Sequence, residues 1–348
     1  MWKKFTTLAL ALALIVTVFA APAQADTPTV IYMSASGSDS NDGSDLAHGV
    51  KTLERVEALV SGLTTDVEVR IDQGTYTAGQ TYWTTFITGH SITFMPADFT
   101  PGMALGDFAG RPIFQSNGGP GWWMYAQLPS GHPGGDTNLR FYYLQIQGYA
   151  TGGLAIHGRY TTVNGLRVPA TAGANSNYGY GLYFQNLGNV YNTSEMGIAG
   201  LDLINSDNNY FRNIHFVHLE NTTADASHIH GVYLAHGSDN NTLLNSDYSW
   251  ITGNPVDIRN GSNDNTIDGN TFTRSGKYGY LSDWFLEAGT PHECASWDNT
   301  LSNNDMVSAY NGSTTLPLTD LTPAGATYAG LSPCVAGGTT RVITSGNY

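Results

Sequence analysis

A short motif, Asn followed by any residue and then Leu, Ile or Phe, recurs through the second half of this chain. Its asparagines stand at intervals of 32, 24 and 34 residues, and the seventh residue after each is large and apolar. Fainter copies that begin with threonine precede them, at Thr137 and Thr161. A repeat of about two dozen residues is typical of a solenoid, in which each coil buries its apolar face against its neighbours. The four clear copies begin at Asn209, Asn241, Asn265 and Asn299.

Short runs within each repeat indicate β-strands. Residues 231 to 234 (Gly-Val-Tyr-Leu) and 255 to 258 (Pro-Val-Asp-Ile) alternate, and alternation with a period of two places successive side chains on opposite faces of a strand. Three short strands per coil, no intervening helices and 41 glycines predict a parallel β-helix. The repeated Asn predicts a ladder, in which side-chain amides hydrogen-bond to the backbone of the next coil.

The ends of the chain depart from the repeat. Residues 1 to 25 carry Lys3 and Lys4, an apolar stretch and a small-residue cleavage site, which together predict a secretory signal peptide. Residues 26 to 62 are predicted to form an N-terminal segment with a cap helix at 51 to 60, and the β-helix is predicted over 63 to 309. Residues 116 to 136 are rich in Gly and Pro and predict a long loop on one coil. Residues 310 to 348 are predicted to form a C-terminal cover.

Composition fits an exported protein. The chain has 14 basic and 28 acidic residues, so removal of Lys3 and Lys4 leaves 12 against 28 and a mature charge of −16. Such a surface disfavours nucleic acid and anionic membranes as partners, and we expect a secreted, extracellular monomer. The two cysteines, Cys294 and Cys334, predict one disulfide that tethers the C-terminal cover.

The N-terminal segment carries a family resemblance. The run from Tyr32 to Gly43, followed by Lys51-Thr52-Leu53 and Gly74-Thr75-Tyr76, resembles the opening of secreted right-handed parallel β-helix proteins of the pectate-lyase-like superfamily. The Asn-Thr-Ile/Leu repeats resemble that superfamily's coils over most of residues 30 to 309. The resemblance implies an all-β fold, a single-stranded right-handed parallel β-helix with an N-terminal helical cap.

The same resemblance does not decide the activity. The superfamily includes polysaccharide lyases, glycoside hydrolases, sugar epimerases and non-catalytic surface proteins. The chain contains neither the aspartate-pair motif of the polygalacturonases nor the Asp-Pro-His motif of the mannuronan epimerases. The site must therefore be predicted from the geometry of the coils.

Strand alternation predicts one outward-facing row. If Val232 and Leu234 point inward, Tyr233 points outward, and the same parity turns Asp257 and Arg259 outward on the next coil. The row also receives Tyr183, Asp202 and His157 from earlier coils, which are assigned to substrate binding together with Trp250. For Trp250, packing in a loop is the alternative interpretation.

An insertion lies beside this row. The 32-residue coil from Asn209 to Asn241 exceeds 24 residues by eight, and the excess falls around residues 221 to 230, where it carries His228 and His230. Insertions on one face of a solenoid often carry function. We expect His228, His230 and Tyr233 to transfer protons. A zinc site made of His228, His230 and His236 is a weaker alternative, because the spacing matches no known signature.

Three functions remain open. The first is a polysaccharide lyase acting on a uronate-containing glycan by β-elimination, with Arg259, or a Ca²⁺ ion bound by Asp257, neutralising the substrate carboxylate. The second is an inverting glycoside hydrolase that uses Asp202 and Asp257. The third is a non-catalytic glycan-binding or surface protein. The lyase is the preferred hypothesis, and the acidic charge of the chain counts against a polyanionic substrate.

Overall fold

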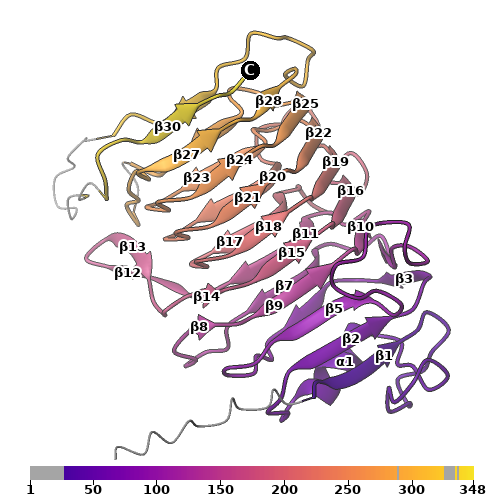
Figure 1. Ribbon diagram of the computed structural model, residues 1–348. Helices are drawn as coiled ribbons and strands as arrows, with labels where there is room; N and C mark the ends of the chain where they lie inside the picture. Colours follow the sequence, from indigo (N-terminus) through magenta and orange to yellow (C-terminus); the bar gives the residue numbers. More distant parts are fainter. Residues whose placement is uncertain (1–26, 288–289, 325–333, 335–336) are drawn as a thin grey trace, which may run out of the picture.

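Three long parallel sheets form the body of the protein (Figure 1). The computed structural model describes residues 27–287, 290–324, 334 and 337–348, so the predicted signal peptide lies outside the described residues. Successive coils pair in parallel, each strand with its counterpart one coil away, and the predicted parallel β-helix with an N-terminal helical cap is confirmed.

The first sheet has ten strands: β1 (Thr29–Met33), β2 (Val67–Ile71), β5 (Ile92–Pro96), β9 (Leu139–Tyr142), β15 (Tyr178–Tyr180), β18 (Tyr210–Arg212), β21 (Thr242–Leu244), β24 (Thr266–Asp268), β27 (Asn299–Ser302) and β30 (Val342–Ser345). The second sheet has eight: β3 (Thr75–Ala78), β6 (Ile113–Ser116), β10 (Gln145–Gln147), β16 (Tyr183–Leu187), β19 (His215–Leu219), β22 (Asp247–Ile251), β25 (Thr271–Ser275) and β28 (Asp305–Met306). The third sheet, which carries the candidate site, also has eight: β4 (Thr81–Trp83), β7 (Trp122–Gln127), β11 (Gly152–His157), β17 (Ala199–Ile204), β20 (His230–Ala235), β23 (Val256–Arg259), β26 (Leu281–Asp283) and β29 (Thr319–Leu321).

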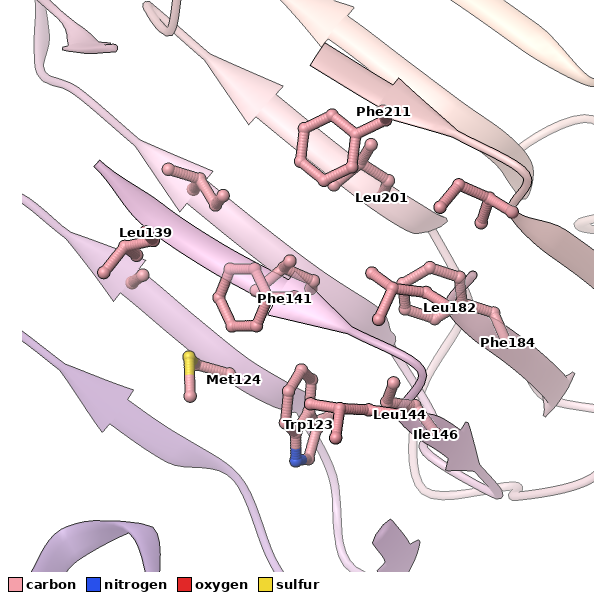
Figure 2. Packing of buried hydrophobic residues seen from close by; sticks show 14 of the residues in the cluster. Trp123, Met124, Leu139, Phe141, Leu144, Ile146, Leu182, Phe184, Leu201 and Phe211 are labelled. Carbon is pink, nitrogen blue, oxygen red and sulfur yellow. The ribbon is translucent and has the colours of Figure 1, made fainter. Parts of the chain in front are cut away.

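The interior is a continuous apolar column that follows the stack (Figure 2). Equivalent aromatic side chains of four coils lie one above another, with ring centroids 5.4, 4.7 and 4.7 Å apart along Phe184, Phe216, Tyr248 and Phe272. The last three are seventh residues after a repeat Asn. The apolar residue of the sequence repeat therefore corresponds to a stack of aromatic rings, to which each of these coils contributes one ring.

The predicted asparagine ladder is confirmed. Each amide oxygen accepts the backbone N–H of the Asn one coil earlier, at 3.0 Å for Asn241, 2.9 Å for Asn265 and 3.0 Å for Asn299. Asn177 belongs to the same ladder, since its N–H donates to the Asn209 amide oxygen at 2.8 Å. The predicted copy at Thr161 is wrong, because Thr161 is an exposed residue of a hairpin that projects from the stack.

Both ends of the stack differ from the predicted boundaries. The cap helix α1 (Leu53–Val60) is present, with Thr52 as its N-cap. The sheets begin before this helix, because β1 pairs with β2, and they continue beyond residue 309 through β29 and β30. The predicted loop at 116–136 is wrong in part, since β7 crosses it as a strand of the third sheet. Cys294 and Cys334 form the predicted disulfide, with Cα atoms 5.5 Å apart.

Three insertions flank the third sheet. The loop at residues 220–229 leads into β20, as the 32-residue spacing predicted. The loop at residues 284–298, of which 288 and 289 are not described, follows β26. An antiparallel hairpin of β12 (Tyr160–Val163) and β13 (Leu166–Pro169) follows β11, and a short pair of strands, β8 (Gly135–Asp136) and β14 (Ala174–Asn175), lies beside it. Figure 1 shows the hairpin projecting from the side of the stack.

Candidate active site on the third sheet

One outward-facing row of the third sheet alternates carboxylates with hydroxyls. Tyr233 of β20 pairs in register with Asp202 on one side and with Asp257 of β23 on the other. Asp257 pairs with Ser282 of β26, and Ser282 pairs with Asp320 of β29. Neighbouring positions on such a row, which we call rungs, lie about 4.8 Å apart. The three carboxylates occupy every second rung. The parity that the sequence predicted for Tyr233 and Asp257 is the one observed.

A cleft of about 360 Å³ opens over the C-terminal part of this row. Its wall brings together the five residues that the sequence singled out for chemistry, which are His228, His230, Tyr233, Asp257 and Arg259. Ser227 and His228 of the loop at 220–229 line one part of the wall, and Trp284 of the loop at 284–298 lines another. The insertions of two different coils thus contribute to one cleft.

His230 is held as a neutral base at the start of β20. Its Nδ1 lies 2.6 Å from the carbonyl oxygen of Asn254, so Nδ1 donates a hydrogen and Nε2 keeps its lone pair. Nε2 lies 3.7 Å from Oδ2 of Asp257. Burial lowers the pKa of His230 to about 4. The imidazole is therefore uncharged at neutral pH and can accept a proton at Nε2.

Asp257 is a buried acid in the floor of the cleft. Its carboxyl accepts a hydrogen bond of 2.6 Å from the Ser282 hydroxyl. Burial raises the pKa of Asp257 to about 7; the Ser282 bond and Arg259 oppose this rise, and the charge of Asp320 adds to it. Asp257 is 6% exposed, so solvent screens its charge only weakly. The group can hold its proton up to neutral pH and act as a hydrogen-bond donor.

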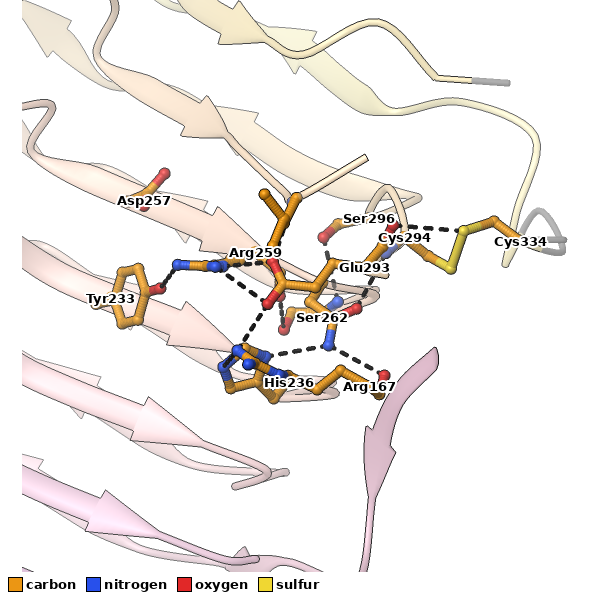
Figure 3. A network of polar contacts seen from close by, with 12 residues as sticks. Arg167, Tyr233, His236, Asp257, Arg259, Ser262, Glu293, Cys294, Ser296 and Cys334 are labelled. Atoms are coloured by element: carbon orange, nitrogen blue, oxygen red, sulfur yellow. Dashed lines mark hydrogen bonds and ion pairs between the residues drawn. A yellow bond between two sulfur atoms is a disulfide. The ribbon is translucent and has the colours of Figure 1, made fainter. Parts of the chain in front are cut away.

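Tyr233 and Arg259 form a hydrogen-bonded pair beside these two groups (Figure 3). Arg259 Nη1 donates to the Tyr233 hydroxyl at 3.2 Å, and the Tyr233 ring stacks on His230 with centroids 5.8 Å apart. Burial raises the pKa of Tyr233, and the positive charge of Arg259 opposes that rise. The guanidinium also lies over the Trp284 ring, 4.4 Å from its centroid. Arg259 can therefore stabilise negative charge on the Tyr233 oxygen.

The sequence did not single out Glu293, which holds Arg259 in place. Glu293 is fully buried, and its two carboxylate oxygens accept from Arg259 Nε at 2.7 Å and from Arg259 Nη2 at 3.0 Å. Sequence reasoning also missed Ser282 and Asp320, and it did not place Trp284 in the site. The available signal was the 34-residue spacing from Asn265 to Asn299, which marks the second insertion.

His157 and Asp202 lie on the same sheet but form a separate polar cluster. His157 Nε2 lies 2.9 Å from Oδ2 of Asp202, and its Nδ1 lies 3.0 Å from the Tyr125 hydroxyl. Both residues are buried, and neither is among the residues that line the cleft. Asp202 nevertheless occupies the rung beside Tyr233.

Two predicted substrate-binding residues lie on a different sheet. Tyr183 belongs to β16 of the second sheet, where it pairs with His215, so the prediction that it joins the row of Tyr233 is wrong. Trp250 belongs to β22 of the second sheet, and His218 stacks on its ring at 5.7 Å while Arg274 lies 4.8 Å from its centroid. Both residues therefore lie outside the cleft.

The described residues offer one set of three metal-ligand side chains close enough to share an ion, namely His292, Cys294 and Cys334. Its two sulfurs are joined in the disulfide and provide no thiolate. The three histidines of the zinc hypothesis, His228, His230 and His236, do not form such a group. No helix of the described part is long and apolar enough to cross a membrane.

Comparison with known proteins supports the fold. No protein-family model and no curated protein matches the chain. Among solved structures, pectate lyase Pel9A is similar at a TM-score of 0.52 and 13% identity, over 93% of this chain and 79% of that one. A rhamnogalacturonan lyase matches at a TM-score of 0.38 and 13% identity, over 92% and 87% of the two chains. The likeness to Pel9A confirms the predicted resemblance to pectate-lyase-like proteins at the level of the parallel β-helix.

Proposed function

We propose that this protein is a carbohydrate-active enzyme that cleaves a uronate-containing polysaccharide by β-elimination. The observation that carries the proposal is the placement of a neutral His230, with Nε2 as acceptor, beside a Tyr233 hydroxyl that is hydrogen-bonded to Arg259. Elimination needs a base and an acid close together, and it needs the carboxylate of the sugar to be neutralised. One wall of the cleft offers groups for all three tasks.

The roles follow from the protonation states. Asp257 in its protonated form donates a hydrogen bond to the uronate carboxylate. His230 Nε2 removes the proton from the carbon next to that carboxylate, a carbon–carbon double bond forms, and the bond to the glycosidic oxygen breaks. Tyr233 gives its proton to the leaving oxygen, while Arg259 stabilises the phenolate. The proton on His230 then returns to Tyr233, which restores the enzyme.

The cleft also offers aromatic surfaces and a charge balance that suit a sugar chain. Tyr278 and Trp284 line it and are 53% and 48% exposed, so their rings offer surfaces on which sugars can stack. Arg167, Arg259 and the buried Glu293 form a cluster of two positive groups and one negative group. Its net positive charge offsets the carboxylate of Asp320, which also lines the cleft, so that with Asp257 protonated these groups do not oppose a uronate substrate.

Hydrolysis by two carboxylates is the second candidate, and the row of the third sheet favours it. Asp257 and Asp320 both line the cleft, and two rungs place them about 9.6 Å apart along the row. This is close to the roughly 6.5–9.5 Å at which inverting glycosidases hold their acid and base. In this alternative Asp320 takes the role that the sequence predicted for Asp202, because Asp202 is hydrogen-bonded to His157.

A substrate panel tests the proposal. The purified protein is incubated with uronate-containing and neutral polysaccharides, and the ultraviolet absorbance of the new double bond is followed together with reducing ends. Elimination raises both signals on a uronate polymer. A rise in reducing ends alone would replace the proposal by hydrolysis, and no cleavage of any polymer would leave binding as the function.

Two variants locate the chemistry in the cleft. His230→Gln and Tyr233→Phe are each expected to lower turnover about 10²-fold or more, because each removes a proton-transfer group. His215→Gln is the matched control, since His215 lies on the second sheet in an ion pair with Asp247. Equal activity of all three variants would place the reaction elsewhere.

A further inference from the structure

The inserted hairpin of β12 and β13 is connected to the cleft residue Arg259 through Arg167 and Glu293. Arg167 Nη1 donates to Oε1 of Glu293 at 2.8 Å, and this is the same oxygen that accepts from Arg259 Nη2. Glu293 Oε2 accepts from Arg259 Nε and from the Leu286 N–H at 3.1 Å. The buried carboxylate thus joins a residue of an early coil to a residue of the cleft, as Figure 3 shows.

The backbone holds the hairpin in this position. Leu166 forms a β-bridge with His292, the Arg167 N–H donates to the His292 carbonyl at 2.9 Å, and the His292 N–H donates to the Gly165 carbonyl at 2.6 Å. The Asn260 side chain donates to the Arg167 carbonyl at 3.2 Å. The hairpin, which follows β11 in the chain, is therefore hydrogen-bonded to the loop at 284–298.

Both arginines contribute to the electrostatic stabilisation of the Glu293 carboxylate. A buried carboxylate is costly unless charged donors satisfy it, and two guanidinium groups with three of its bonds meet that need. The fork of Arg259 has a fixed planar geometry. With Nε and Nη2 bound to Glu293, its Nη1 is directed to the Tyr233 hydroxyl. The orientation of that hydroxyl therefore depends on Glu293, and Glu293 depends on Arg167.

We propose that Glu293 and Arg167 are positioning residues for the reaction, and that the β12–β13 hairpin is a functional part of the active site. Neither residue is among those that line the cleft. Together they fix the guanidinium of Arg259 so that it orients the Tyr233 hydroxyl and stabilises the phenolate when the proton leaves. The kinetic part of this inference rests on the proposed function, and the geometric part does not.

Arg167→Gln is the main test, because Arg167 is partly exposed and its loss removes one donor to Glu293 without emptying the core. We expect kcat to fall about tenfold with KM changed less than about twofold, since the transition state loses stabilisation and sugar contacts do not. Arg167→Lys restores the charge and is expected to recover part of the loss. Thr162→Ala is the control, because Thr162 is the exposed partner of Arg167 across the hairpin.

Fluorescence provides a readout that needs no substrate. Arg259 lies over the Trp284 ring, so a displaced guanidinium exposes that ring to water. The Trp284 emission, obtained by difference from Trp284→Phe, is expected to move to longer wavelength in Arg167→Gln and in Glu293→Gln, and to stay unchanged in Thr162→Ala. This result would support the positioning role even if the wild-type protein cleaved its glycan by hydrolysis.

Three outcomes would overturn the inference. Unchanged Trp284 emission in a folded Arg167→Gln variant would show that Arg259 does not need the hairpin. A higher KM with unchanged kcat would assign Arg167 to substrate binding. A loss of activity that Arg167→Lys and Thr162→Ala share to the same extent would reflect general damage to the hairpin. Melting temperatures of all variants identify any that fail to fold, and Arg167→Gln remains informative if Glu293→Gln is unstable.

Discussion

Replacing Asp257 by asparagine is expected to change how the stability of the protein depends on pH. The ordinary pKa of this carboxyl is 3.8, and burial raises it to about 7 in the folded protein. A difference of about three pKa units, at about 1.4 kcal/mol each, corresponds to about 4 kcal/mol. The contribution is fully present below pH 3.8, where both states are protonated, and is lost as the pH rises through about 7.

The pKa of His230 is shifted in the opposite direction, so its contribution to stability changes with pH in the opposite sense. The wild type must therefore be compared with a variant. Burial lowers its pKa from 6.5 to about 4, and its contribution is present above pH 6.5 and is lost as the pH falls through about 4. The two trends partly cancel in the wild type. The Asp257→Asn variant carries an amide that cannot ionise in place of the carboxyl, whereas His230 remains, so the difference between the two proteins isolates the carboxyl.

Urea unfolding at a series of pH values between about 4 and about 8 measures this difference. The free energy of unfolding of the wild type, relative to the variant, is expected to fall by up to about 4 kcal/mol across this range. A difference that stays constant with pH would show that Asp257 ionises normally. It would then be unable to serve as the protonated partner of a substrate carboxylate at neutral pH.

Three further predictions concern the disulfide, the ladder and the aromatic wall. Cys294→Ser should lower the unfolding free energy by up to about 4 kcal/mol, because it opens a cross-link of separation 40, and an unchanged melting temperature would contradict this. Asn265→Ala should cost about 2 kcal/mol in urea unfolding, since it leaves the buried Asn241 N–H without its acceptor, and a neutral effect would refute the ladder's importance. Trp284→Ala should raise KM severalfold in kinetic assays if sugar stacks on its ring, and an unchanged KM would exclude that contact.

The fold could be predicted because the coils repeat the same physical requirement. A buried amide at one turn and a large apolar side chain in the stack recur on successive coils, so Tyr248 follows Asn241, and Phe272 follows Asn265, by the same seven residues. The same logic failed at Thr161. Sequence spacing alone could not distinguish a coil from an inserted hairpin of similar length.

Only the part of the site that follows from the alternation of side chains along a strand could be predicted. Alternation shows whether a side chain points inward or outward, and it placed Tyr233 and Asp257 correctly. It does not show which of three sheets a run belongs to, because all three alternate alike, and Tyr183 was misplaced for this reason. The position of a residue relative to the nearest ladder asparagine indicates its sheet: Tyr183 follows Asn177 by six residues, whereas Tyr233 precedes Asn241 by eight.

Glu293 was beyond this kind of reasoning. It lies in an inserted loop, and its contacts with Arg259 and Arg167 join residues that no repeat relates. The fold of such a loop depends on long-range contacts, including the neighbouring disulfide of Cys294. A sequence can mark the presence of the insertion, but the network that it forms becomes visible only in three dimensions.

Cleavage of the active polysaccharide in water enriched in heavy oxygen tests the central claim most directly. β-Elimination breaks the glycosidic bond without adding water, so mass spectrometry of products sampled before their reducing ends exchange oxygen with water should find a carbon–carbon double bond and no oxygen from the solvent. Products with one solvent oxygen at the cleaved bond and no double bond would contradict elimination. They would assign the cleft, with Asp257 and Asp320, to hydrolysis.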